Sequence, residues 1–292
     1  MAHVSVIGPG AIGCQAAAAV QRAGRHELSI CSRRPLPTIK VEQRGEPPLV
    51  LSARIVTDPS AVHGPADLVI LAVKAHQTVG AAAWLSRLCA AGTLLAVLQN
   101  GVEHVQRVAP YCGAATILPV VVHCSALMHA PEVARSGGPL RLIAPDGPGA
   151  ARLVAALRGS GARIETTGAF VTEAWTKLCW NAVAGLMAAA AAPAVIFCDA
   201  SVRERARRLA LETIRVGRAE GARIDDAYAD ELIAGFAALP PASGTSILTD
   251  RLAGRPLEWD ARNGVVQRLG ARHGVPTPET DSLVEVLAAV SG

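Results

Sequence analysis

Short apolar runs alternate with longer segments of helical periodicity in the first half of the chain. The apolar runs predict strands at 3–7, 27–31, 67–73, 94–98 and 116–123, and the segments 11–24 and 75–91 predict helices. Because the run 68–73 contains no polar residue, it is typical of a parallel strand that helices cover on both faces. The pattern predicts a doubly wound α/β fold.

The second half changes to helical periodicity. A Gly/Pro-rich stretch at 136–148, a helix at 149–159 and a strand at 162–166 complete the first part. Helices are then expected at 170–191, 199–220, 226–238, 260–273 and 278–290, with Pro/Gly breaks between them. We expect an N-terminal Rossmann-type domain with a doubly wound parallel sheet over 1–167 and a C-terminal all-helical domain over 168–292. A cleft between two such domains is the natural place for a ligand.

The uncharged stretch 178–198 has the length of a membrane span. It is built from alanine rather than leucine and contains Asn181, Gly185 and Pro193, so a buried helix with close packing of small residues is the better interpretation. The chain starts without the basic flank of a signal peptide, and its seven cysteines include no CxxC pair. These features favour a cytoplasmic protein with free thiols and no membrane partner.

Composition and charge exclude several classes of protein. Of the 292 residues, 51% are hydrophobic and 18% are charged, which excludes a disordered or fibrous chain. The net charge of +4 is small and only 3% of residues are aromatic, so no nucleic acid partner is expected. The apolar helices are compatible with a monomer and equally with a homodimer.

A glycine-rich turn follows the first strand and opens the first helix. Its glycines allow a tight turn, a close approach of the backbone to a pyrophosphate and close contact of helix with strand. A purely structural turn is the alternative. The turn consists of Gly8, Pro9, Gly10, Ala11, Ile12 and Gly13.

The second strand ends in Ser32, Arg33 and Arg34, where an NAD-specific protein usually carries an acidic residue. A guanidinium offers a planar pair of donors that suits a 2′-phosphate. NADP(H) is therefore favoured over NAD(H) as cofactor, the alternative being that both arginines lie in a solvated loop.

Five further segments carry polar residues of the kinds that take part in catalysis or ligand binding. Two follow the strands predicted at 67–73 and 94–98, and three lie in the helical half. In the segment 173–181, Lys177 and Asn181 are four residues apart and so share a helix face. The segments are 73–77 (VKAHQ), 99–102 (QNGV), 173–181 (EAWTKLCWN), 245–250 (TSILTD) and 255–260 (RPLEWD).

With these motifs in this order, the sequence resembles the ketopantoate reductase family, the ApbA/PanE-like 2-dehydropantoate 2-reductases of pantothenate biosynthesis. The resemblance covers almost the whole chain. It implies an NADP(H)-dependent oxidoreductase that reduces a small 2-oxo acid, 2-dehydropantoate, to the 2-hydroxy acid (R)-pantoate. The binding partner is then this small molecule, with no metal involved.

The resemblance also assigns roles to residues. Lys177 would be the general acid, Glu258 would be catalytic and contact the substrate hydroxyl and the cofactor, and Asn181 and Ser246 would bind the substrate. Asn100 would contact both the substrate and the reactive end of the cofactor. Other cofactor contacts would come from the glycine turn and from Arg33, Arg34, Lys74 and Gln77.

The chemistry agrees with a lysine at this position. Hydride addition to a 2-oxo acid builds negative charge on the carbonyl oxygen, and a positioned proton donor accelerates such a step roughly 10²–10⁴-fold. Burial can bring the pKa of a lysine toward neutrality, whereas arginine keeps its proton. Lys177 is one of only three lysines in the chain. An ordinary surface lysine is the alternative.

One position departs from the family pattern. Where the family carries a second asparagine, four residues after the first, this chain has Gly185, and the small residues at 186–194 would leave room for a bulkier group. Two alternatives therefore stay open, a reductase of a different 2-oxo acid and a non-catalytic NADP-binding sensor. His123, Cys124 and His129 lack a carboxylate at ligand spacing, so no metal site is expected.

Overall fold

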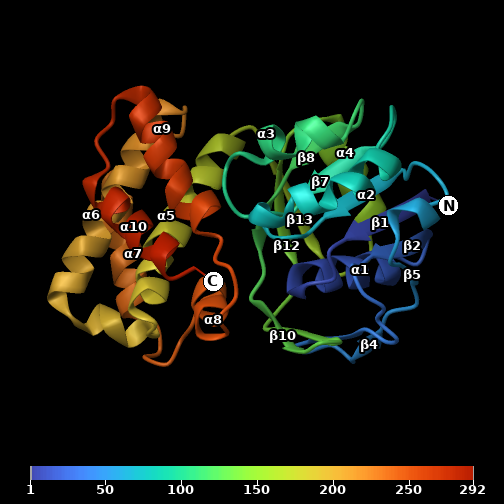
Figure 1. Ribbon diagram of the computed structural model, residues 1–292, viewed down its shortest axis with the longest axis horizontal. Helices are drawn as coiled ribbons and strands as arrows, with labels where there is room; N and C mark the ends of the chain where they lie inside the picture. Colours follow the sequence, from blue (N-terminus) through green and yellow to red (C-terminus); the bar gives the residue numbers. More distant parts are fainter. Residues whose placement is uncertain (1, 292) are drawn as a thin grey trace. The chain divides into compact units, whose positions relative to one another are not determined.

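The computed structural model describes residues 2–291, which divide into two compact units (Figure 1). The first unit runs to Gln99 and continues from His104 to Phe170. The second contains Asn100–Glu103 and the chain from Val171 onward. Whereas the sequence suggests one boundary near 167, the chain enters the second unit twice.

The first unit is built on a six-stranded parallel sheet in the order β5-β2-β1-β6-β7-β8. Side chains of α1 (Ala11–Ala23) and α4 (Pro148–Leu157) pack on one face, and those of α2 (Ala82–Leu88) and α3 (His104–Val108) on the other. This arrangement confirms the predicted doubly wound Rossmann-type fold. The strands are β1 (Ala2–Ile7), β2 (His26–Cys31), β5 (Arg54–Val56), β6 (Leu68–Leu71), β7 (Leu94–Val97) and β8 (Thr116–Pro119).

Two smaller sheets were not predicted as such, although the strand expected at 162–166 is β13 and the one expected at 116–123 includes β9. One has the order β10-β11-β3-β4, and the other places β12 between β13 and an antiparallel β9. Most of these strands are short and half-exposed, so they carry no continuous apolar run. Their bounds are β3 (Lys40–Gln43), β4 (Leu49–Val50), β9 (Val121–His123), β10 (Ala126–Ala130), β11 (Val133–Ser136), β12 (Arg141–Pro145) and β13 (Arg163–Thr167).

Two predicted elements of the first unit differ from the structure. The helix expected over 75–91 is two 3₁₀ turns, Ala75–Gln77 and Val79–Ala81, followed by α2. Thr78 and Gly80 both weaken an α-helix there, and the Thr78 hydroxyl donates to Ala75 O at 2.8 Å. The strand expected over 116–123 breaks after Pro119 into β8 and β9, which join different sheets.

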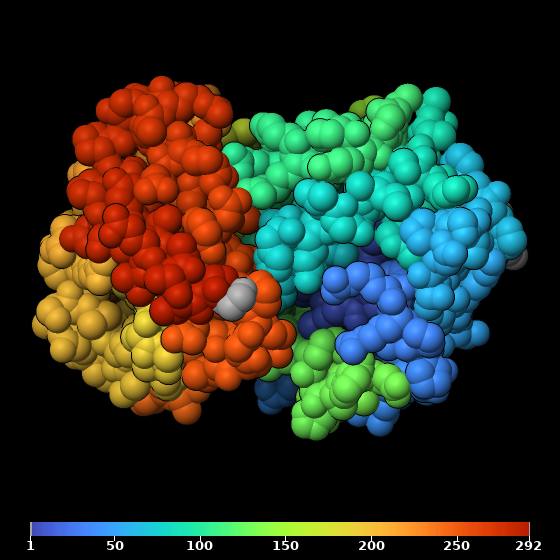
Figure 2. Space-filling model, in the orientation of Figure 1, coloured from blue at the N-terminus to red at the C-terminus, as the bar shows by residue number. Residues whose placement is uncertain are grey.

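The second unit is helical, as predicted. Its core forms around α5, whose residues 181–188 are all buried. Figure 2 shows α8, α9 and α10, in orange to red, on the visible face of this unit. No helix within 2–291 combines the length and apolarity that crossing a membrane requires. The helices are α5 (Phe170–Ala190), α6 (Ala200–Ala219), α7 (Ala227–Ala237), α8 (Ser246–Leu252), α9 (Val265–His273) and α10 (Pro278–Ala289).

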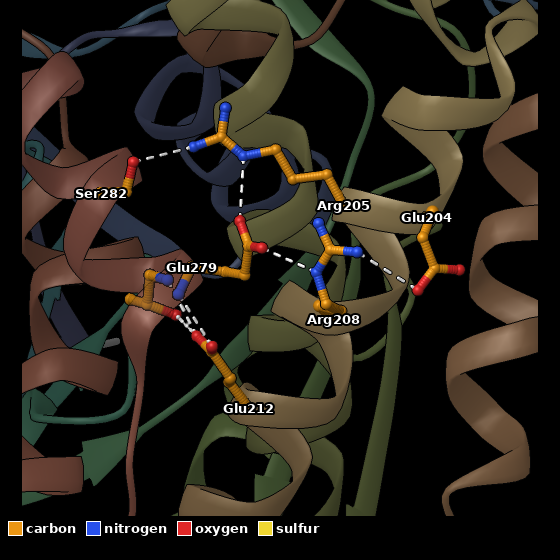
Figure 3. A network of polar contacts seen from close by, with 7 residues as sticks. Glu204, Arg205, Arg208, Glu212, Glu279 and Ser282 are labelled. Carbon is orange, nitrogen blue, oxygen red and sulfur yellow. Dashed lines mark hydrogen bonds and ion pairs between the residues drawn. The ribbon is translucent and has the colours of Figure 1, made fainter.

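Polar contacts fix α10 against α6 (Figure 3). The buried carboxylate of Glu212 accepts hydrogen bonds from the backbone N–H groups of Glu279 and Thr280, at 2.9 and 2.8 Å, and from the Thr280 hydroxyl at 2.7 Å. At the surface, Glu279 lies between Arg205 and Arg208 and pairs with both. Glu212 thus stabilises the first turn of α10, where backbone donors have no partner within the helix.

Candidate functional site

The glycine turn of the first unit requires glycine at two positions. Gly8 has φ +95°, and a Cβ there would lie 2.6 Å from Val73 Cγ1. A Cβ at Gly13 would lie 2.0 Å from Gly8 O, so the turn could not close with any other residue. At Gly10, by contrast, a Cβ would meet no atom within 4 Å. Neighbouring protein atoms therefore exclude a side chain at Gly8 and Gly13, whereas the space beside Gly10 is open.

This turn lies where the strand order of the sheet reverses, between β1 and β6. Ligands of open α/β folds bind at such a point, beyond the carboxyl ends of the strands. Gly10 precedes α1, and no side chain within the described residues caps that helix, so the N–H groups of its first turn are available to an anion. The turn fits the pyrophosphate of a dinucleotide.

The other residues assigned to the cofactor follow neighbouring strands. Arg33 and Arg34 are exposed just after β2, and the Arg34 N–H donates to Ser32 Oγ at 3.4 Å. After β6, the half-buried Lys74 opens a 3₁₀ turn in which the Gln77 N–H donates to Lys74 O at 2.8 Å. All four lie past the carboxyl ends of parallel strands, at the same edge of the sheet as the glycine turn.

In the second unit, side chains from three separate segments form a hydrogen-bonded chain. Asn181, on α5, donates through Nδ2 to Asn100 Oδ1 at 3.4 Å, and Asn100 Nδ2 donates to Glu258 Oε2 at 3.0 Å. Asn181 and Glu258 are buried. Gly101 makes the approach of the Asn100 segment possible, because its φ is +102° and a Cβ there would lie 2.8 Å from Ala261 O.

Lys177 lies one helical turn before Asn181 on α5 and is half-buried. Its ammonium group forms no hydrogen bond or ion pair with another residue of the described chain. Burial, and then the positive charge of Arg262, lower the pKa of Lys177 from 10.5 to about 8. Such a group can both hold and release a proton near neutral pH.

Arg262 is a member of this cluster that the sequence did not single out. It is 2% exposed, and its Nη2 donates to Ser246 Oγ at 2.9 Å and lies 3.7 Å from Glu258 Oε2. It belongs to a π-helical turn, Asp260–Gly264, that precedes α9. The spacing of four residues from Glu258 could have indicated a shared helix face. Ser246 itself is exposed, at the start of α8.

Gly185, where the family pattern has a second asparagine, is closely surrounded by other residues. A Cβ at Gly185 would lie 2.9 Å from Asn263 Oδ1, 3.2 Å from Leu283 Cδ2 and 3.3 Å from Leu287 Cδ1. Asn263 is fully buried, and its Nδ2 donates to Ala182 O at 3.1 Å. A carboxamide from another segment therefore fills the space beside Gly185 itself, while the room expected from the small residues at 186–194 stays a prediction.

The second unit thus gathers an ammonium group, two carboxamides, a carboxylate, a guanidinium and a hydroxyl. Donors of this kind suit an anionic oxygen-rich ligand and a reaction that places charge on an oxygen. Within residues 2–291, no group of three histidine, cysteine or acidic side chains lies close enough to hold a metal ion. All seven cysteines are free thiols.

Comparisons with known proteins agree along the whole chain. The family model described as "Ketopantoate reductase PanE/ApbA" matches residues 4–148, and that of the C-terminal part of the same family matches 169–291. A 2-dehydropantoate 2-reductase of Mycobacterium tuberculosis is 42% identical, covering 99% of this chain and 97% of its own. One of Caulobacter vibrioides is 36% identical over 100% of both chains. The crystal structure of a 2-dehydropantoate 2-reductase from Geobacter metallireducens superposes with a TM-score of 0.90 at 27% identity, covering 99% of this chain and 100% of that one.

Proposed function

Since the chain belongs to the ketopantoate reductase PanE/ApbA family of NAD(P)-dependent oxidoreductases, we propose that it reduces 2-dehydropantoate to (R)-pantoate with NADPH. One observation carries the proposal. Lys177 presents an ammonium that has no partner among residues 2–291 and whose pKa is lowered to about 8, in the same unit as the Asn181–Asn100–Glu258 chain. A group of this kind suits protonation of a carbonyl oxygen.

The first unit would hold the cofactor, which supplies the hydride. The N–H groups at the start of α1 would bind the pyrophosphate, with the open side of Gly10 toward it. Lys74 and Gln77, past the end of β6, would bind along the dinucleotide. Asn100 and Glu258 would contact its reactive end, as the family resemblance implies.

Arg33 and Arg34 support NADPH over NADH. Both guanidiniums are exposed past the end of β2, where the ribose of a dinucleotide is bound in this fold, and the strand does not end in an acidic residue. A guanidinium stabilises a 2′-phosphate through paired charge-assisted hydrogen bonds. NADPH should therefore have a lower KM than NADH, and Arg33→Ser should narrow the difference.

Lys177 would donate its proton to the substrate carbonyl oxygen as negative charge develops there. Asn181 and Ser246 would orient the substrate through their amide and hydroxyl groups. Glu258 would accept a hydrogen bond from the hydroxyl of the product, and Asn100 holds that carboxylate in place at 3.0 Å. Each role uses a group with the donor or acceptor character that the step requires.

A panel of 2-oxo acids tests the substrate. NADPH oxidation is followed by absorbance with 2-dehydropantoate, 2-oxoisovalerate and a 2-oxo acid with an aromatic side chain. The highest kcat/KM with 2-dehydropantoate supports the proposal, and a higher value with another acid replaces the substrate. Tight NADPH binding with no oxidation in the presence of any acid would make the protein a sensor.

A further inference from the structure

Arg262 is a buried charge without the partners that stability alone would require. The side chain is 2% exposed, and its Nε–H has no hydrogen-bond partner in the described part of the chain. A carboxylate oxygen of Glu258 lies 3.7 Å away and already accepts from Asn100. Removing a guanidinium from water costs several kcal/mol unless ion pairs and hydrogen bonds replace the lost hydration. Packing by an apolar side chain would be less costly, so Arg262 calls for a functional explanation.

The hydrogen bond from Arg262 fixes the direction of the Ser246 hydroxyl. Ser246 Oγ accepts from Arg262 Nη2 at 2.9 Å. Because this lone pair is occupied by a charged donor, the hydroxyl proton must point elsewhere, and it becomes a directed donor toward an acceptor outside the pair. Ser246 is exposed, so that acceptor can be a ligand.

The charges of the cluster select the kind of acceptor. Lys177 and Arg262 are cationic, and the carboxylates of Glu258 and Asp250 both act on the charge of Arg262. Lys177 has no ion-pair partner among residues 2–291, so a ligand with a negative charge would supply the counter-charge that this ammonium lacks. After burial, the positive charge of Arg262 is the second cause of the lowered pKa of Lys177. A bound anion would weaken this repulsion between the two cations.

We propose that Arg262 is a positioning residue which, through its hydrogen bond to Ser246, directs the Ser246 proton to the carboxylate of the bound 2-oxo acid and selects a substrate charged at that end. This inference rests on the proposed function, since it requires reduction of a 2-oxo acid. It adds the residue that distinguishes the free acid from an uncharged analogue of the same shape.

The test compares 2-dehydropantoate with its methyl ester as substrates. Wild-type protein should prefer the acid, and Arg262→Met should raise KM for the acid roughly 10- to 100-fold, the effect of one charge-assisted hydrogen bond, while KM for the ester changes little. Arg262→Lys, which keeps the charge and lacks the planar fork, should recover part of the preference. Arg207→Met, which removes a guanidinium from an exposed ion pair with Asp230 on α6, serves as the matched control and should match wild type.

A folded Arg262→Met variant that keeps the wild-type preference for the acid overturns the inference. If that variant does not fold, Ser246→Ala decides, because it should lose the same preference while Arg262 remains in place. When both variants fold, the double variant should be no worse than either single one, and additive losses would contradict the proposed coupling. Wild-type protein that reduces neither compound would instead overturn the proposed function, so the two failures are distinguishable.

Discussion

Replacing Glu212 by glutamine should destabilise the helical unit strongly, although the side chain lies away from the functional cluster. The carboxylate accepts three hydrogen bonds at the start of α10, between 2.7 and 2.9 Å, and is 4% exposed (Figure 3). Glutamine keeps one acceptor oxygen and places an NH₂ donor against the other N–H or O–H donors. One hydrogen bond is lost, and the remaining two are made to a neutral acceptor instead of a charged one.

A hydrogen bond to a charged group contributes about 1.5–3 kcal/mol, and one between neutral groups about 1 kcal/mol. Losing one charged bond costs about 1.5–3 kcal/mol, and weakening each of the other two costs about 0.5–2 kcal/mol, so the free energy of unfolding should decrease by about 2.5–7 kcal/mol. The matched control is Glu204→Gln on the same helix, which changes charge equally. Its side chain is 56% exposed and lies 3.3 Å from Arg208, so its cost should be about 0.5 kcal/mol or less.

Urea unfolding followed by tryptophan fluorescence measures both variants. Three of the four tryptophans, Trp175, Trp180 and Trp259, belong to the helical unit, so the signal reports mainly on its transition. If Glu212→Gln and Glu204→Gln had equal urea midpoints, the hydrogen bonds to the buried Glu212 carboxylate would not stabilise the first turn of α10.

Four further predictions concern Lys177 and three of the glycines. Because reduction needs protonated Lys177, whose pKa is about 8, kcat/KM for reduction should fall above about pH 8, while kcat/KM for the reverse oxidation, which needs the neutral amine, should rise through the same range. Lys177→Arg should lower turnover roughly 10²–10⁴-fold and remove this pH dependence, because arginine keeps its proton. Gly185→Asn should lower the free energy of unfolding by about 1–3 kcal/mol in thermal melts, since its Cβ would lie 2.9 Å from Asn263 Oδ1; an unchanged melting temperature would contradict the crowding. Gly13→Ala should destabilise the unliganded protein, whereas Gly10→Ala should leave stability unchanged and weaken NADPH binding measured by titration, because only the Gly10 side is open; equal stability of the two variants would refute the assignment.

The fold follows from the sequence wherever burial is complete. The strand 68–71 is apolar at every position and lies in the middle of the parallel sheet. The helix α5 contains no charged residue from position 178 to its end. The strands β3 and β10 escaped prediction because their half-exposed residues follow no clear alternation. The helix α8 spans only Ser246–Leu252, too short for helical periodicity to emerge.

The functional cluster was only partly predictable, because local spacing reports on one element at a time. Lys177 and Asn181 are four residues apart, so a single helix brings them to one face. Asn100 and Glu258 are far apart in sequence, and only the family resemblance connected them before their 3.0 Å contact was seen. Arg262 is one arginine among many, and its burial depends on packing that no local pattern encodes.

Turnover of 2-dehydropantoate with NADPH, compared between wild-type protein and Lys177→Ala, tests the proposed reaction and its proton donor together. We expect wild-type protein to oxidise NADPH, and the variant to lose most of this turnover while it binds NADPH with unchanged affinity. Equal turnover in the two proteins would contradict the role of Lys177 as proton donor, and with it the mechanism proposed for this chain.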